Sequence, residues 1–109
     1  MVAKKQQRAI AEMPKKIAPM LCTLTRAPVD NDAYVYEVKW DGYRIIAYAD
    51  DSGVRLASRS GLDYAKKYPL VADALEGLGH EVIIDGEVIV ENEAGKPDFD
   101  ALQKYNGKR

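Results

Sequence analysis

The chain has 109 residues, of which 47% are hydrophobic and 30% are charged, and its formal net charge is -1. This length and composition fit one small globular domain, and they exclude a membrane-spanning helix because no apolar run approaches the roughly 20 residues that cross a bilayer. The basic start lacks the apolar stretch of a secretory signal, and the single cysteine, Cys22, allows no internal disulfide, so we expect a cytoplasmic protein.

Residues 1–18 are expected to form a basic N-terminal arm ahead of a single domain at residues 19–109. Within residues 1–16, Glu12 stands alone against five basic side chains: Lys4, Lys5, Arg8, Lys15 and Lys16. Such an arm could contact nucleic-acid phosphates. A solvated, mobile terminus explains the same charges more simply, so charge does not decide the function.

A pattern with a period of two predicts a first strand at residues 34–40. Aromatic and apolar residues at the even positions, Trp40 among them, alternate there with Val35, Glu37 and Lys39. We therefore expect the even positions in the core, and Glu37 and Lys39 together on the other face.

Two further strands are predicted at residues 43–50 and 54–59. The pair Asp41-Gly42 is typical of a hairpin turn, and the phrase "DDSG" marks the next turn. This antiparallel meander would bring Arg44 back beside the lysine of the first strand.

The second half of the chain adds two helices and one strand. Apolar residues at helical spacing predict a helix near residues 69–78, with proline in its first turn. Residues 81–90 are apolar on both faces and are expected to form a central strand, and a shorter helix is expected near residues 98–106. The predicted fold class is α+β, a twisted antiparallel sheet with packed helices.

Several charged residues fall inside or at the ends of these predicted strands. Asp85 and Glu87 share one parity within "IIDGEVIV", where carboxylates are costly unless they are paired, hydrogen-bonded or bound to a cation. The phrase "SRSG" places Arg59 beside small residues, where a backbone could approach an anion.

Together with Lys39 and Arg44, these residues suit attack by a lysine amine on a nucleoside triphosphate. Arginines and a cation held by carboxylates would neutralise the phosphate charge, and nearby positive charge would lower the lysine pKa. The alternative is a surface sheet on which Glu37 and Lys39 are merely solvated neighbours.

Three motifs make the chain resemble the covalent nucleotidyltransferases, which include ATP-dependent DNA ligases, RNA ligases and mRNA capping enzymes. "KWDGYR" (residues 39–44) matches the family pattern Lys-x-Asp-Gly-x-Arg at every fixed position. "SRSG" resembles the second arginine motif, and "DGEV" (residues 85–88) resembles the Asp-Gly-Glu motif. The phrases "GVRLASRSGLDYAKKYP" and "GKPDFDALQ" are most similar to the ligase domain of bacterial non-homologous end-joining ligases.

This resemblance implies the first part of an ATP-grasp-like adenylation domain. ATP and Mg²⁺ (or Mn²⁺) would be its cofactors, and nicked or broken duplex DNA would be its substrate. Lys39 would form the lysyl-AMP phosphoramidate, and Glu37 would receive the adenine amino group. Arg44 and Arg59 would contact the ribose or the phosphates, and Glu87 would contact the ribose or the metal.

Asp85 belongs to the third motif, but a role as a strand-end hydrogen-bond acceptor is as well supported as a direct contact. The later glutamate and lysine motifs of the family, and its OB-fold domain, do not occur in these 109 residues. We therefore expect a fragment of a DNA ligase that is inactive alone, has no contact with membranes, and can self-associate through an uncovered sheet edge. The alternatives are a capping-type guanylyltransferase, an RNA ligase, a non-catalytic module that binds DNA or a partner, and a plain structural α+β domain.

Overall fold

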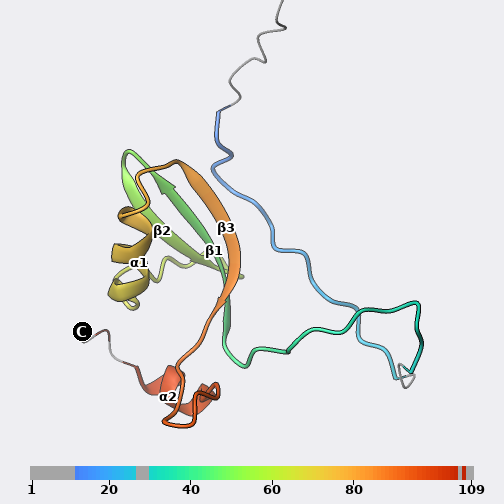
Figure 1. Cartoon of the computed structure of the whole chain (residues 1–109). Helices are drawn as coiled ribbons and strands as arrows, with labels where there is room; N and C mark the ends of the chain where they lie inside the picture. The colour runs from blue at the N-terminus through green and yellow to red at the C-terminus, as the bar shows by residue number, and fades with distance from the viewer. Residues whose placement is uncertain (1–11, 27–29, 106, 108–109) are drawn as a thin grey trace, which may run out of the picture.

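A three-stranded antiparallel sheet forms the centre of the computed structural model, which describes residues 12–26, 30–105 and 107 (Figure 1). The central strand is β1 (Tyr43–Asp50), with β2 (Gly53–Ser58) on one side and β3 (Val82–Val88) on the other. Helix α1 (Pro69–Glu76) connects β2 to β3, and helix α2 (Phe99–Lys104) follows β3. The predicted α+β class is confirmed.

Strand β1 is central because it is apolar on both of its faces. Ile45 and Ala47 belong to one buried cluster, with Leu56 and Leu102, whereas Ile46 and Tyr48 belong to a second cluster, on the other face. All four of these β1 residues are at most 6% exposed. A strand buried on both faces needs a neighbour at each edge, and β2 and β3 provide them.

Both predicted helices are present, and local signals explain where they begin. Pro69 occupies the first turn of α1, where its missing N–H costs nothing. The side chain of Asp98 caps α2 by accepting a hydrogen bond from the amide of Ala101. Leu102 of α2 is fully buried, and the ring of Phe99 meets the edge of Tyr43 at 5.4 Å between centroids.

The prediction of a strand at residues 81–90 is confirmed by β3, but its predicted central position is wrong. Within the described part of the chain, β3 pairs with β1 alone, and its residues from Ile84 to Glu87 are exposed. Asp85, Gly86 and Glu87 interrupt the apolar run, so β3 buries less than β1 and takes the edge of the sheet.

The prediction of a strand at residues 34–40 is also wrong. This segment is extended but belongs to no strand, and it leaves the sheet (teal in Figure 1). Its apolar side chains are exposed, with Val35 at 98%, Tyr36 at 67% and Trp40 at 47%. The place beside β1 that a hairpin would give this segment is taken by β3, whose Val88 pairs with Tyr43.

Gly42 is required for a reason other than the predicted hairpin turn. The φ angle of Gly42 is not positive, whereas the hairpin turn typical of Asp-Gly requires a positive φ at the glycine. That turn type is therefore excluded. A Cβ at this position would lie 2.1 Å from the carbonyl oxygen of Val88. Glycine therefore permits the close approach of β3 to the start of β1.

The described part of the N-terminal arm lies across the second face of the sheet, on the side opposite α1 (blue in Figure 1). Its Met13 packs on the second buried cluster, and its Ile17 amide donates to the hydroxyl of Tyr48 at 2.7 Å. These contacts attach the segment to the sheet, although most side chains of residues 12–20 are exposed. Residues 1–11 of the predicted arm lie outside the described residues. Neither the length nor the hydropathy needed to cross a membrane is reached by any helix in the described part.

Candidate functional site

Arg44 and Asp85 form a two-pronged ion pair between adjacent strands. The guanidinium donates from Nε to Oδ1 at 2.7 Å and from Nη2 to Oδ2 at 2.6 Å. The hydrogen bond to Arg44, and then its charge, lower the pKa of the Asp85 carboxyl, and the same pair raises the pKa of Arg44. Both side chains remain partly exposed, at 32% for Arg44 and 47% for Asp85.

A third hydrogen bond ties the same guanidinium to the N-terminal segment. Nη1 of Arg44 donates to the carbonyl oxygen of Met20 at 2.7 Å. Arg44 thus links β1, β3 and the segment that crosses the sheet. A guanidinium has five N–H groups, so these three bonds leave two N–H groups that no described residue engages and that could meet an anion.

A groove of about 560 Å³ at one end of the sheet brings Arg44 and Arg59 together. It is lined by Gly42 and Tyr43 at the start of β1, by residues 58–60 at the end of β2, and by Tyr64. Residues of the first two motifs therefore line the same groove.

The turn that carries Arg59 is fixed by Ser58. The carbonyl oxygen of Ser58 accepts from the amide of Gly61 at 2.9 Å, and its Oγ accepts from the amide of Leu62 at 3.0 Å. Gly61 has a φ of +89°, which a residue with a side chain rarely adopts. The "SRSG" sequence thus builds a tight turn that holds the backbone of Arg59 at the groove.

Glu37 and Lys39 are not among the residues that line this groove. Both are exposed and lie on the extended segment before β1. The predicted placement of Arg44 beside Lys39 on a paired strand is wrong, because residues 34–40 form no ladder with β1. Only two residues, however, separate Lys39 from Gly42, which lines the groove.

Glu87 faces Arg44 across the β1–β3 ladder and is exposed. Asp85 pairs with Ile46 two positions further along, so Arg44, Asp85 and Glu87 share one face of the sheet. In the described ranges, no three His, Cys, Asp or Glu side chains gather in a way that could hold a metal ion.

Lys67 is a residue near the groove that the sequence analysis did not single out. Its ammonium lies 5.5–5.7 Å from the ring centroids of Tyr43, Tyr64 and Tyr68, and the first two of these rings line the groove. The local signal for it is the phrase "YAKKY", which places Tyr64 and Tyr68 on either side of the lysines, whereas Tyr43 comes from a separate part of the chain.

The sequence matches one protein family over residues 1–109, the ATP dependent DNA ligase domain. It is 44% identical over 92 residues to the multifunctional non-homologous end joining protein LigD of Pseudomonas aeruginosa, which covers 84% of this chain and 11% of that protein. The chain therefore spans about a tenth of the length of this relative.

Two solved structures are similar to this fold. One is the ligase domain of M. tuberculosis LigD, at 43% identity and a TM-score of 0.56. The other is a mycobacterial DNA ligase D complexed with ATP and MES, at 46% identity and a TM-score of 0.53. Each likeness covers 62% of this chain and 23% of the solved chain.

Proposed function

The chain belongs to the ATP-dependent DNA ligase family, and from this we propose that it supplies the nucleophile and part of the phosphate-binding wall of a DNA ligase. One observation carries the proposal: three motifs that are far apart in the sequence meet at one end of the sheet. Arg44 of the first motif shares a groove with Arg59 of the second. The same Arg44 forms an ion pair with Asp85 of the third.

In the proposed reaction, Lys39 is the nucleophile. Its deprotonated amine attacks the α-phosphorus of ATP, an N–P bond forms, the bond to the β-phosphate oxygen breaks, and pyrophosphate leaves. The two unused N–H groups of Arg44 and the guanidinium of Arg59 would stabilise the negative charge that develops on the phosphate oxygens. Glu37 would accept a hydrogen bond from the adenine amino group.

The short connection between Lys39 and the groove supports this assignment. Three residue steps lead from Lys39 to Gly42, and they span at most about 11 Å when fully extended. Rotation about the backbone of Trp40 and Asp41 would therefore suffice to bring the lysine side chain to the groove. In the proposed active arrangement, residues 34–41 are held beside the groove that contains Arg44 and Arg59. In the present structure these residues are exposed.

Magnesium or manganese is a further part of the proposal, with Glu87 as the ligand from this chain. The residues present fit such an ion, because Mg²⁺ in phosphate-transfer sites is commonly held by one or two carboxylates, substrate phosphates and water. Glu87 is exposed on the face that carries Arg44. When bound, the ion would neutralise phosphate charge. Asp85 is less suited to the metal, because both of its oxygens accept from Arg44.

Nicked or broken duplex DNA is the proposed substrate, and the cytoplasm the proposed location. Support for DNA comes from the family and from the relative named for non-homologous end joining. The reaction with DNA would transfer AMP from Lys39 to a 5′-phosphate, after which the 3′-hydroxyl attacks that phosphate and AMP leaves.

A chimaeric ligase tests the assignment of Lys39. This chain would replace the matching segment of the M. tuberculosis LigD ligase domain, to which it is 43% identical. Incubation with ATP and magnesium should add one AMP, detected by intact mass spectrometry and located by peptide mapping. Lys39→Ala should abolish the adduct, and so should Lys39→Arg, because a guanidinium stays protonated and cannot attack.

Lys96→Ala is the matched control, because Lys96 is exposed and lines none of the described grooves. It should leave the adduct unchanged. An AMP adduct that persists in Lys39→Ala would refute the assignment. Labelling by GTP in preference to ATP would instead favour a capping-type guanylyltransferase.

A further inference from the structure

A second groove, of about 360 Å³, lies between the N-terminal segment and the sheet. Residues 16–19 form one wall, Tyr48 and Arg55 contribute from β1 and β2, and residues 58–61 close one end. Three cationic residues line this groove, namely Lys16, Arg55 and Arg59, and none of the described residues that line it is acidic.

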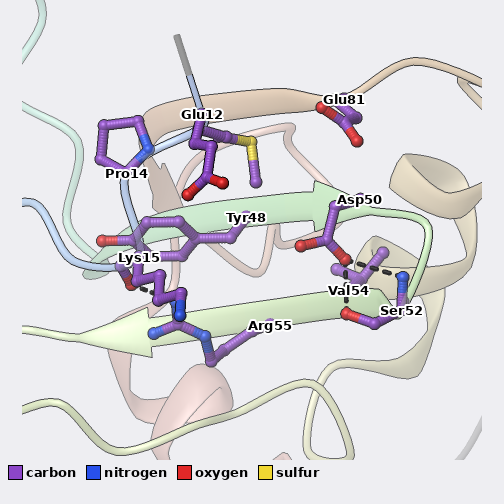
Figure 2. Close-up of a pocket in the computed structure, with 11 residues that line it drawn as sticks. Glu12, Pro14, Lys15, Tyr48, Asp50, Ser52, Val54, Arg55 and Glu81 are labelled. Atoms are coloured by element: carbon purple, nitrogen blue, oxygen red, sulfur yellow. Dashed lines mark hydrogen bonds between the residues drawn. The ribbon is translucent and has the colours of Figure 1, made fainter.

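Tyr48 and Arg55 build the groove by fixing the N-terminal segment. They are direct partners across the β1–β2 ladder, and the guanidinium lies 4.0 Å from the centroid of the Tyr48 ring. The Tyr48 hydroxyl bonds to the backbone of Ile17, and Arg55 donates to the carbonyl oxygen of Lys15. The wall that carries Lys16 is therefore held by specific contacts to two neighbouring strands. Figure 2 shows one of them, the bond from Arg55 to Lys15.

A neighbouring pocket, also lined by the N-terminal segment, differs from this groove in the charges that line it. The neighbouring pocket, of about 520 Å³, is lined by three carboxylates, Glu12, Asp50 and Glu81, and by two cations, Lys15 and Arg55 (Figure 2). Arg55 borders both spaces. The lining of that pocket thus has an excess of one carboxylate, whereas the second groove has three cations and no carboxylate, so an anion is favoured on the side toward Arg59.

Arg59 and Ser60 line both this second groove and the groove that contains Arg44. The two spaces therefore meet at the turn after β2. A continuous surface with several cations and serine hydroxyls suits a chain of phosphates better than a single small anion, because successive charges can be neutralised along it.

We propose that the second groove binds the phosphodiester backbone of DNA as the strand leaves the candidate site. Lys16 and Arg59 contact phosphates, and Tyr48 and Arg55 act as positioning residues that hold the segment carrying Lys16. This inference rests on the proposed function, since it takes DNA as the substrate of the same site.

The salt dependence of DNA binding tests the groove without any ATP. The 109-residue chain would be titrated against a fluorescent nicked duplex over a range of low salt concentrations. Lys16→Gln should weaken binding and reduce the slope of log K against log salt by about one unit, the signature of one lost phosphate contact. Lys96→Gln removes an equal charge outside the groove and should leave the slope unchanged.

Tyr48→Phe tests whether the position of the N-terminal segment, and not only its charge, matters for DNA binding. It removes no charge, but it removes the hydroxyl that holds Ile17, so affinity should fall while circular dichroism shows an intact fold. An unchanged slope in Lys16→Gln, an equal effect of Lys96→Gln, or no binding by the wild type at the lowest salt would overturn the proposal. AMP transfer to Lys39 in the chimaeric ligase without the Lys16 effect would overturn only the groove. The Lys16 effect without AMP transfer in the chimaeric ligase would overturn only the proposed catalysis.

Discussion

Arg44 and Asp85 lie 41 residues apart in the sequence and meet through two parallel hydrogen bonds, 2.7 and 2.6 Å long. A two-pronged arginine–carboxylate pair fixes orientation as well as distance. Here it fixes the start of β1 against β3 and satisfies both oxygens of Asp85. Asp85 is a hydrogen-bond acceptor, as one of its two predicted roles requires, but it lies in the middle of β3 and not at a strand end; a direct contact with a ligand stays a prediction.

The first prediction concerns the pH dependence of this pair. The pKa of Asp85 is lowered from 3.8 in the fold, chiefly by the hydrogen bond from Arg44. Its ionised form therefore stabilises the fold above the unfolded pKa, and this contribution is lost as the pH falls through the lowered folded pKa. Asp85→Asn should reduce the free energy of unfolding by a small amount at neutral pH, because both side chains are partly exposed.

Urea unfolding followed by circular dichroism, from neutral pH down to below pH 3.8, measures this effect. The difference between wild type and Asp85→Asn should shrink as the pH falls. Asp50 also has a lowered pKa, through its hydrogen bonds with Ser52, so the wild type and the variant should both retain some acid sensitivity. A difference that stays constant with pH would contradict the prediction.

The second prediction compares two glycines beside the same strand pair. Alanine at position 42 would place its Cβ 2.1 Å from the Val88 carbonyl oxygen and 2.8 Å from a methyl carbon of Ile89. The first contact is with backbone, so β1 or β3 must shift, and we expect a loss of about 1–3 kcal/mol in the free energy of unfolding. Alanine at position 86 would meet nothing within 4 Å and should change it by less than about 0.5 kcal/mol.

Urea midpoints of Gly42→Ala and Gly86→Ala decide this comparison. Equal midpoints would show that Gly42 is not needed for the approach of β3 to the start of β1.

Local sequence patterns predicted most of the helices and strands. They did not predict which strands pair with each other in the sheet. Pro69 and Asp98 mark helix starts through groups within their own turns, so both helices could be read directly. Alternation at residues 34–40 reports which side chains would share a face, but it does not say which strand supplies the ladder. That position beside β1 belongs to β3, from a part of the chain about 40 residues away.

The candidate site was predictable to a similar degree. The motifs predicted Arg44 and Arg59 in one site; both residues line one groove, and their roles in that site stay predictions. The position of Lys67 beside Tyr64 and Tyr68 is local, but its approach to Tyr43 depends on packing between distant segments, which no local period encodes. The roles of Glu37, Lys39 and Glu87 in binding and catalysis stay predictions.

The third prediction contrasts two tyrosine hydroxyls. The Tyr48 hydroxyl is hydrogen-bonded to the backbone of Ile17, so Tyr48→Phe should lower the free energy of unfolding by about 0.5–1.5 kcal/mol. The Tyr68 hydroxyl is buried without a partner among the described residues, and burial raises its pKa to about 12. Tyr68→Phe should therefore be neutral or stabilising, because it removes an unsatisfied polar group.

Hydrogen exchange gives a second, local readout of the same pair. The Ile17 amide should exchange faster in Tyr48→Phe and at the wild-type rate in Tyr68→Phe. If both variants lose the same stability, the hydroxyl of Tyr48 does not anchor the N-terminal segment.

The last prediction concerns the 109-residue chain by itself. Lys39 is exposed and lies outside the groove that contains Arg44 and Arg59, and loss of one preorganised donor typically costs about 10²–10³ in rate. We therefore expect no AMP on Lys39 after incubation of this chain with ATP and magnesium, under conditions in which the chimaeric ligase is labelled. The check is intact mass spectrometry over a range of protein concentrations. A stoichiometric adduct at every concentration would show that residues 34–41 reach the groove unaided. An adduct that appears only at high concentration would also contradict the expectation for the single chain. It would point to a second copy that pairs with the outer edge of β3, which no described strand covers.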